Sequence, residues 1–314
     1  MASRGSPLAV AQAELVATRL RRAYPSLEVE LVTIATTGDS DQRPFRHIGG
    51  KGLFVAEVER AVVEGRADVA VHSAKDLTAD LAESATIVCV PERASPVDVV
   101  VGGAGSSGEE RLGSLAPGAV VGTSSARRRA LIAEARPDLE VADLRGNLGT
   151  RLGRVAEAQL DAAVVAAAGL ERLAPEVSPP WSLLDPTWWV PAPAQGALAV
   201  EARADRADLA ELLGPLDDPV ARAEVTSERA YARRLEGGCS VPLGCLARAG
   251  AHDLVVSGYV GAPDGASGLR DRISGPVDSA AALGAELAEA LLGAGADDLL
   301  AEIATGSAAV VAPP

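Results

Sequence analysis

Short apolar runs alternate with helical patterns over the first two-thirds of this chain, and this order constrains the fold more than any other feature. Residues 7–22 place apolar side chains near a 3.6-residue spacing, which predicts a helix, and residues 27–35 alternate as a strand. A helix over 53–64 and short buried strands over 68–72 and 86–90 are predicted next. Strand–helix alternation of this kind predicts an α/β layered structure with largely parallel sheets.

A second unit of the same kind follows an interval rich in Gly, Ser and Pro at 102–118. Its predicted elements are a strand at 119–122, a helix at 125–135, a strand at 140–144, a helix at 147–158 and a strand at 161–166. Residues 175–193 hold six prolines and all three tryptophans, which predicts a domain boundary with a packed loop. A helix over 219–235 and the segments 254–261 and 277–292 then indicate a smaller α+β end.

The net charge of −14 argues against a nucleic-acid or anionic-membrane surface, because attraction to phosphate needs a basic face. The three cysteines, Cys89, Cys239 and Cys245, show no CxxC spacing, so neither a disulfide framework nor a metal site is expected. The start of the chain lacks the apolar stretch of a secretory signal, and no run approaches the ~18 apolar residues of a membrane span. A soluble cytoplasmic protein is therefore predicted.

Only two of the 29 basic residues are lysines, Lys51 and Lys75. Lys75 and Asp76 follow a predicted strand, so they belong at its carboxyl end, where open α/β sheets bind ligands. The two charges could simply pair with each other. An acid beside cations in a crevice could equally stabilise a cationic intermediate or move protons. His72 has apolar strand neighbours and is interpreted as a structural histidine.

Seven arginines lie between residues 127 and 154, an unusual density in so acidic a chain. Two of the segments that carry them, 122–129 and 144–151, begin where a strand gives way to a helix, and helix N-termini bind anions. This predicts a ligand with several carboxylates or phosphates. The favoured binding residues stand beside glycines and strand ends: Arg127, Arg128, Arg145 and Arg151. Arg129 and Arg136 are interpreted instead as a solvated helix face paired with Glu134 and Asp138.

Cys239 follows two glycines that lift the chain away from the end of a predicted helix. Glycine leaves a neighbouring thiol uncovered, so Cys239 is interpreted as available for covalent attachment or nucleophilic attack. Cys89 and Cys245 have apolar neighbours and are interpreted as small core residues.

Taken in order, these motifs resemble the porphobilinogen deaminase family, whose members are also called hydroxymethylbilane synthases. The resemblance runs almost end to end. It rests on residues 3–9, 36–39, 49–54, 67–76, 121–128, 143–151, 168–173, 193–197 and 235–242. Only three residues precede Arg4, so the first strand is expected to be short.

The resemblance implies a transferase of haem and porphyrin synthesis, which joins four porphobilinogens head to tail, releases ammonia each time and then frees hydroxymethylbilane by hydrolysis. It implies a dipyrromethane cofactor on a thioether to Cys239. Asp76 would be the catalytic acid that stabilises an azafulvenium-like cation. The other cofactor contacts would be Ser73, Lys75, Thr123, Ser125, Arg127, Arg128 and Gly146. The substrate contacts would be Arg4, Ser6, Phe54, Arg145, Arg151, Arg172 and Gln195.

The resemblance also implies an α/β fold made of two periplasmic-binding-protein-like lobes and a smaller C-terminal α+β domain. Lobe 1 would span 1–92 with 194–212, lobe 2 would span 98–191, and the cysteine-bearing domain would span 214–314. A monomer is expected. Two alternatives stay open: an organic-anion sensor or carrier, which gives Cys239 no use, and a thiol-dependent transferase of another kind, for which no histidine stands near Cys239 in the sequence.

Overall fold

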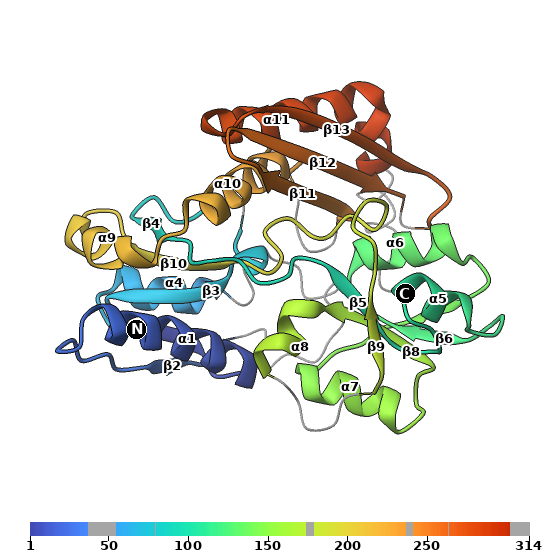
Figure 1. Cartoon of the computed structure of the whole chain (residues 1–314), viewed down its shortest axis with the longest axis horizontal. Helices are drawn as coiled ribbons and strands as arrows, with labels where there is room; N and C mark the ends of the chain where they lie inside the picture. Colours follow the sequence, from blue (N-terminus) through green and yellow to red (C-terminus); the bar gives the residue numbers. More distant parts are fainter. Residues whose placement is uncertain (37–54, 79, 174–178, 237–240, 263, 302–314) are drawn as a thin grey trace, which may run out of the picture.

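The residues that the computed structural model describes are 1–36, 55–78, 80–173, 179–236, 241–262 and 264–301, and their strands form two five-stranded sheets and one three-stranded sheet (Figure 1). The two larger sheets lie side by side, and the smaller one lies above them in the view of Figure 1. The predicted α/β class with a smaller C-terminal α+β part is confirmed.

The first sheet has the strand order β2-β1-β3-β10-β4. Its strands are β1 (Ala2–Arg4), β2 (Val32–Ile34), β3 (Val69–Ser73), β4 (Ala85–Cys89) and β10 (Leu198–Arg203). Helix α1 (Pro7–Ala23) packs on the face that carries Val69 and Val71, and α4 (Ala56–Val63) packs on the face that carries Ala70. Because successive strand residues point to opposite faces, the two helices cover opposite sides of the sheet.

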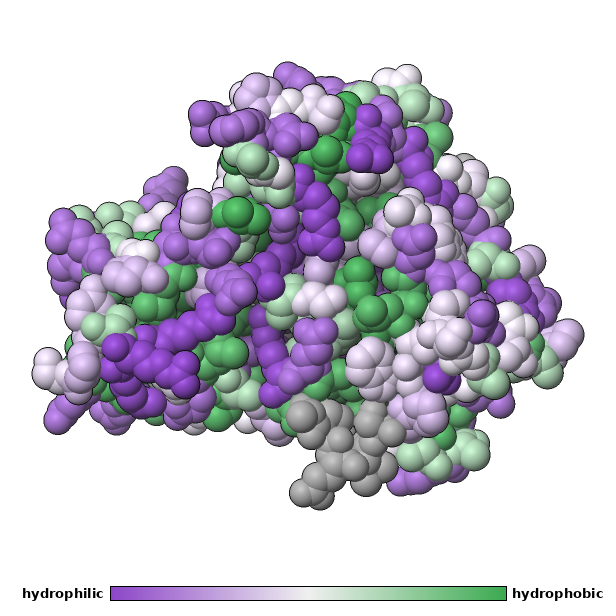
Figure 2. Space-filling view, viewed as in Figure 1, coloured by the Kyte–Doolittle hydropathy of each residue, from purple (hydrophilic) through white to green (hydrophobic). Residues whose placement is uncertain are grey.

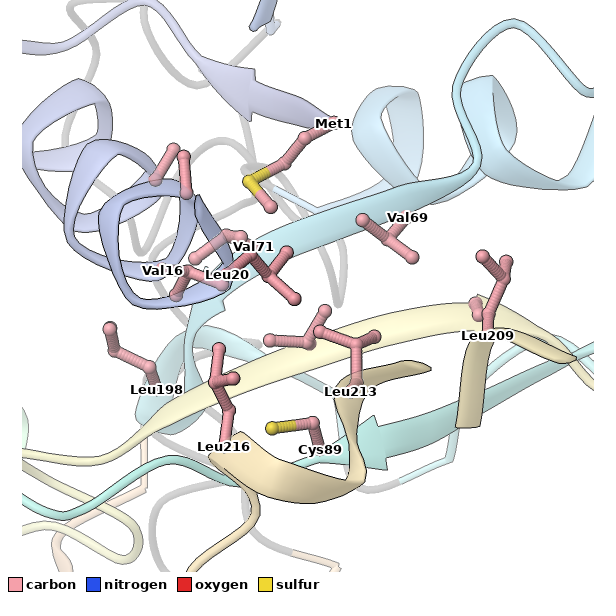
Figure 3. Close-up of a cluster of buried hydrophobic side chains, with 14 residues drawn as sticks. Met1, Val16, Leu20, Val69, Val71, Cys89, Leu198, Leu209, Leu213 and Leu216 are labelled. Carbon is pink, nitrogen blue, oxygen red and sulfur yellow. The ribbon is translucent and has the colours of Figure 1, made fainter. Parts of the chain in front are cut away.

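The core under α1 shows why this helix forms where the periodicity predicts it. Val16 and Leu20 of α1 meet Val71 of β3 and Leu198 of β10, and all four are nearly inaccessible to solvent (Figure 3). Helix α9 (Ala207–Leu213) packs beside β4 and adds Leu209 and Leu213 to the same cluster. Burying large aliphatic side chains stabilises a fold by roughly 1.5–3 kcal/mol each.

The second sheet has the strand order β7-β6-β8-β5-β9. Its strands are β5 (Asp98–Gly102), β6 (Val120–Gly122), β7 (Glu140–Ala142), β8 (Ala162–Ala166) and β9 (Trp181–Leu183). Its helices are α5 (Gly108–Gly113), α6 (Ala126–Ala135), α7 (Leu148–Ala156) and α8 (Ala167–Leu173). Helix α8 lies against α1 of the first sheet, and Leu8 faces Gly169 there.

The third sheet is an antiparallel meander of β11 (Leu243–Ala249), β12 (Asp253–Gly261) and β13 (Gly268–Pro276). Helices α10 (Pro219–Arg234) and α11 (Ala280–Leu291) pack together on one face of it. Tyr231 of α10 is buried there and donates a hydrogen bond from its hydroxyl to the carbonyl of Tyr259 at 3.0 Å.

The chain crosses between the two larger sheets twice. It leaves the first sheet after β4 and enters the second at β5, and it returns between β9 and β10. The two crossings touch: the Ala94 amide donates to the Gly196 carbonyl at 3.2 Å, and the Arg93 Nε donates to the Gln195 carbonyl at 3.0 Å. Each predicted segment, 1–92 with 194–212, 98–191 and 214–314, holds one sheet, and the exact division stays a prediction.

The expectation of largely parallel sheets holds for four of the five strands of each larger sheet, and one strand in each sheet runs the other way. Strands β1, β2 and β3 are parallel, but β10 runs antiparallel to both β3 and β4, and β5 runs antiparallel to β8 and β9. The antiparallel strands β5 and β10 are those reached by the two crossings. A strand that arrives from another sheet enters without a local helical crossover, and such a crossover is what enforces parallel pairing.

Three further expectations need correction. The strand predicted over 27–35 is confined to β2, and the interval 102–118 contains helix α5, whose start is capped because the Ser107 hydroxyl accepts a hydrogen bond from the Glu110 amide. The packed loop predicted over 175–193 contains β9. The short first strand is confirmed, and β1 pairs with both β2 and β3.

On the face drawn in Figure 2, hydrophilic residues surround smaller hydrophobic patches. Within the described residues, no helix is long and apolar enough to cross a membrane.

Candidate functional site

Lys75 and Asp76 occupy a single 3₁₀ turn, Ala74–Asp76, at the carboxyl end of β3. The turn is held in place by Ala74, which is buried and whose amide donates a hydrogen bond to the Ala197 carbonyl at 3.0 Å. Burial and the neighbouring Arg128 lower the pKa of Lys75 to about 8, although Asp76 opposes this. The position that the sequence predicts for this pair, at the carboxyl edge of the sheet, is confirmed.

Arg127 and Arg128 begin helix α6 and converge on one buried carboxylate, Asp98. The Arg127 Nη2 lies 2.8 Å from Asp98 Oδ2, and the Arg128 Nη2 lies 2.7 Å from Asp98 Oδ1. Both guanidinium groups also donate to backbone carbonyls, Arg127 to Val190 and Arg128 to Val164. Burial opposes ionisation of Asp98, but the two arginines hold its pKa well below the usual range.

Gln195 connects this pair to Lys75. Its Oε1 accepts from Lys75 Nζ at 3.4 Å and from Arg128 Nη2 at 3.5 Å. Its Nε2 donates to Asp98 Oδ1 and to the Pro96 carbonyl, each at 2.7 Å. Gln195 is only 1% exposed, so its amide group makes its hydrogen bonds within the protein interior. The substrate contact that the resemblance implies for Gln195 stays a prediction.

Arg151 and Arg145 approach the same place from the second sheet. Asn147 caps α7 by accepting from the Thr150 amide, and the Arg151 Nε donates to the Gly146 carbonyl at 3.0 Å. Burial lowers the pKa of Arg151 to about 10. Arg128, Arg145 and Arg4 contribute to this lowering of the pKa, and Asp76 opposes it, so these charges lie within interaction range of Arg151.

The predicted hydroxyl residues stand at helix and strand ends beside these charges. Ser6 and Ser125 cap α1 and α6, accepting from the Ala9 and Arg128 amides. Thr123 accepts from the Ser125 amide at 3.2 Å, and Ser73 donates to Gln12 at 3.0 Å. The caps at α1 and α6 mark N-termini of helices, which favour anions.

Arg172 lies apart from the others. Its Nη2 donates to the Gly196 carbonyl at 2.7 Å, beside the returning crossing. Burial lowers its pKa to about 10, and the charges that act on it are Glu171 and Arg19 rather than the cluster. Phe54 and Cys239 fall outside the described residues.

Six basic side chains therefore gather around two carboxylates among the described residues. The basic residues are Arg4, Lys75, Arg127, Arg128, Arg145 and Arg151, and the acids are Asp76 and Asp98. Within the same part of the chain, the buried Nε atoms of Arg127 and Arg128 have no hydrogen-bond partner. Six cations against two carboxylates leave an excess of positive charge, so this arrangement fits a ligand that brings several carboxylates.

The structure also shows the contacts of the residues that the sequence analysis interpreted as structural. His72 is buried with its Nε2 2.8 Å from Glu201 Oε2, as expected of a structural histidine. Arg136 pairs with Asp138 as predicted, but Arg129 pairs with Asp143, and Glu134 pairs with Arg270. Cys89 and Cys245 are buried, as predicted. In the described ranges, no group of His, Cys, Asp and Glu side chains is arranged to hold a metal.

Asp98, the buried acid that binds the arginine pair, was not among the candidate residues taken from the sequence. The available signal was an acidic residue directly ahead of the apolar run 99–101, because aspartate is almost never fully buried unless it is paired.

Comparison with known proteins gives consistent matches. Residues 1–211 match the family model "Porphobilinogen deaminase, dipyromethane cofactor binding domain", and residues 222–293 match "Porphobilinogen deaminase, C-terminal domain". The porphobilinogen deaminase of Roseiflexus castenholzii is 47% identical over 300 residues, covering 95% of this chain and 97% of that protein. That of Laribacter hongkongensis is 46% identical over 303 residues, covering 96% of each.

Among solved structures, the periplasmic molybdate-binding protein of Azotobacter vinelandii superposes with a TM-score of 0.38 at 12% identity, covering 70% of this chain and 93% of that one. A score this low adds no argument to the sheet topology already described.

Proposed function

The chain belongs to the porphobilinogen deaminase family, and on this premise we propose how its residues carry out the family's reaction. The protein is a transferase of tetrapyrrole synthesis that uses a dipyrromethane cofactor. It condenses four porphobilinogens head to tail, releases four ammonias, and frees hydroxymethylbilane with one water. When bound, the cofactor supplies the pyrrole ring to which the first substrate is joined.

The cationic cluster holds the acetate and propionate groups of the cofactor. Lys75, Arg127 and Arg128 supply charge, and burial makes each charged hydrogen bond stronger than it would be in water. Ser73, Thr123, Ser125 and Gly146 supply hydroxyl and backbone contacts at the strand and helix ends. The cofactor is anchored through Cys239.

Substrate enters beside the arginines that approach from two sheets. Arg4 and Ser6 lie where β1 gives way to α1, and Arg145 and Arg151 flank the start of α7. These residues, with Phe54, Arg172 and Gln195, bind and orient the incoming pyrrole. Holding both reacting rings by their carboxylates converts a bimolecular step into an oriented one, an effect worth up to ~7–11 kcal/mol.

Asp76 is the catalytic residue. Loss of ammonia leaves the substrate as a cation, and the Asp76 carboxylate offers a negative charge within the same cluster. It also accepts and returns the protons that the condensation moves.

The observation that carries the proposal is the excess of buried cations in a chain whose net charge is −14. An organic-anion sensor would use those cations too, so the intact mass of the purified protein decides between the two. We expect a mass increase of about two pyrrole units and colour with an acidic aldehyde reagent. Both should vanish in Cys239→Ser.

Cys245→Ala is the matched control, because Cys245 is a buried thiol of the same domain. It should retain the added mass and the release of ammonia from porphobilinogen. Unmodified, colourless wild-type protein that releases no ammonia would favour the sensor and overturn the proposal.

We also propose that the protein acts as a cytoplasmic monomer without nucleic-acid or membrane partners, and that its three sheets mark the cores of lobe 1, lobe 2 and the cysteine-bearing domain. The acidic net charge supports the absence of nucleic acid. Light scattering during gel filtration measures the oligomeric state.

A further inference from the structure

One buried carboxylate joins the arginine pair to both crossings between the two larger sheets. Asp98 is 0% exposed and accepts hydrogen bonds from four side chains, those of Arg127, Arg128, Trp189 and Gln195. Asp98 itself ends the outgoing crossing, as the first residue of β5. Trp189 and Gln195 both belong to the returning crossing, between β9 and β10.

Gln195 extends this connection to the turn that carries the catalytic acid. Its amide nitrogen is committed to Asp98 and to the Pro96 carbonyl on the outgoing crossing. Its amide oxygen faces Lys75 and Arg128. The amide can present its oxygen to these cations only while its nitrogen points at Asp98, so the orientation of Gln195 depends on that carboxylate.

A second consequence concerns charge. Arg127 and Arg128 lie side by side in a buried place, and their guanidinium groups would repel each other without a shared anion. One Asp98 charge balances one of the two, so the pair keeps a single uncompensated positive charge. That remaining charge attracts a carboxylate of a ligand to the pair.

We propose that Asp98 is a positioning residue of the reaction, which together with Gln195 sets the place and the net charge of the cation cluster and ties that cluster to both inter-sheet crossings. The identity of the ligand in this inference rests on the proposed function, whereas the hydrogen bonds of Asp98 and Gln195 come from the structure itself. In this role Gln195 acts through Lys75 and Arg128, in addition to the substrate contact proposed for it. The side chains that bind carboxylates are therefore hydrogen-bonded, through Asp98 and Gln195, to the two segments that join the larger sheets.

The test uses the chain's shortage of lysine. Because Lys51 and Lys75 are the only lysines, acetylation followed by peptide mass spectrometry reports each one separately. The charged groups that act on Lys75 are Arg128, Asp76, Asp98 and Arg127, and they and burial place its pKa at about 8. The measurement is the pH midpoint of Lys75 acetylation in the full chain on a Cys239→Ser background, where no cofactor can anchor in any variant.

Asp98→Asn keeps the shape and removes the charge. The negative charge of Asp98 raises the pKa of Lys75, so its removal should shift the acetylation midpoint below the wild-type value of about 8. Gln195→Met removes the facing oxygen dipole, so it should shift the midpoint in the same direction by a smaller amount. In the Cys239 form, kcat per cofactor-loaded molecule should fall roughly 100-fold for Asp98→Asn, the loss expected from an ångström-scale misplacement.

The direction of the midpoint shift separates positioning from mere support of the fold. Local unfolding would solvate Lys75 and raise its midpoint toward the ordinary value of 10.5, and that outcome would overturn the proposal. An unchanged midpoint would overturn it as well. If Asp98→Asn does not fold, the same two outcomes are decided on Gln195→Met.

Asp143→Asn is the matched control, because Asp143 pairs with Arg129 of the same helix α6 but lies at the surface. It should change neither the midpoint nor kcat. The acetylation midpoint depends only on charged groups of the protein, so it still tests the role of Asp98 if the wild-type protein carries no pyrrole. A failure of the proposed function shows instead as missing mass and missing ammonia in wild-type protein.

Discussion

At the scale of the residue, the proposed chemistry depends on one of the two carboxylates in the cation cluster, Asp76. Asp76 shares a turn with Lys75 and acts electrostatically on Arg151 from the opposite sheet. The cations attract the carboxylates of each pyrrole, but the same field repels the positive charge that develops when ammonia leaves. An anion at this position offsets that repulsion where the charge appears.

Replacing Asp76 with asparagine should therefore separate binding from chemistry. Asp76→Asn keeps the shape of the side chain and the cations that bind carboxylates, so the intact mass should still show attached cofactor. The turnover number should drop by ~10²–10⁴, the range of a lost acid–base group. Asp80→Asn serves as the control and should keep full turnover, because Asp80 is an exposed acid in the loop after this turn and pairs with Arg233 of α10. Near-normal turnover of Asp76→Asn would remove it from the mechanism.

Residues were predictable from the sequence where a local motif fixed their chemistry. Lys75 and Asp76 follow a strand, and Arg127, Arg128 and Arg151 stand at helix starts, so their convergence could be predicted from the carboxyl ends of strands. Asp98 could not, because its partner Arg127 lies 29 positions away and no spacing rule connects them. The buried, bonded state of Gln195 depends on the same long-range contact.

At the scale of the element, patterns predicted helices and buried strands well, but they missed the one reversed strand of each larger sheet. Helices α1, α6 and α10 begin and end within about one residue of the predicted ranges, since periodicity and caps are local signals. Strand β10 has an apolar pattern too, but its antiparallel place beside β3 follows from the returning crossing. Direction in a sheet is a property of the path of the chain, which a local pattern does not contain.

The turn before α7 offers a test of how an element aims its side chains. Gly146 has φ of +100°, and a Cβ there would lie 3.0 Å from the Cβ of Thr150. Gly146→Ala should therefore destabilise the turn by about 1–2 kcal/mol. Because the Gly146 carbonyl binds the Arg151 guanidinium, the KM for porphobilinogen should rise several-fold. Thermal unfolding and steady-state kinetics measure the two effects.

Gly153→Ala is the control within the same helix. The nearest atom to a Cβ at Gly153 is the Glu157 Oε1 at 4.0 Å, so the methyl group fits. Replacing a helical glycine in this way should stabilise the protein by ~0.5–1 kcal/mol and leave KM unchanged. If Gly146→Ala behaved like Gly153→Ala, the positive φ would have no part in placing Arg151.

At the scale of the whole molecule, a buried ion-pair network joins the C-terminal sheet to the crossings. Arg93 of the outgoing crossing contacts Glu224 and Glu228 of α10, each at 2.8 Å. Glu228 also accepts from the amides of Ala194 on the returning crossing and Ala247 on β11. Burial opposes the charge on Arg93, but Glu228 and Glu224 raise its pKa above the ordinary value. Three parts of the chain therefore share one set of charges.

Glu228→Gln should show how far the molecule depends on this network. The substitution leaves the Arg93 guanidinium buried with less compensation, and breaking a buried pair of this kind costs about 3–5 kcal/mol. Denaturant unfolding should show that loss. Glu289→Gln, at an exposed pair with Arg234 on the other side of α10, should change stability little because surface pairs are screened by solvent. Equal stability of the two variants would mean that apolar packing alone holds α10 to the crossings, and that the ion pairs of Arg93 with Glu224 and Glu228 add no net stability.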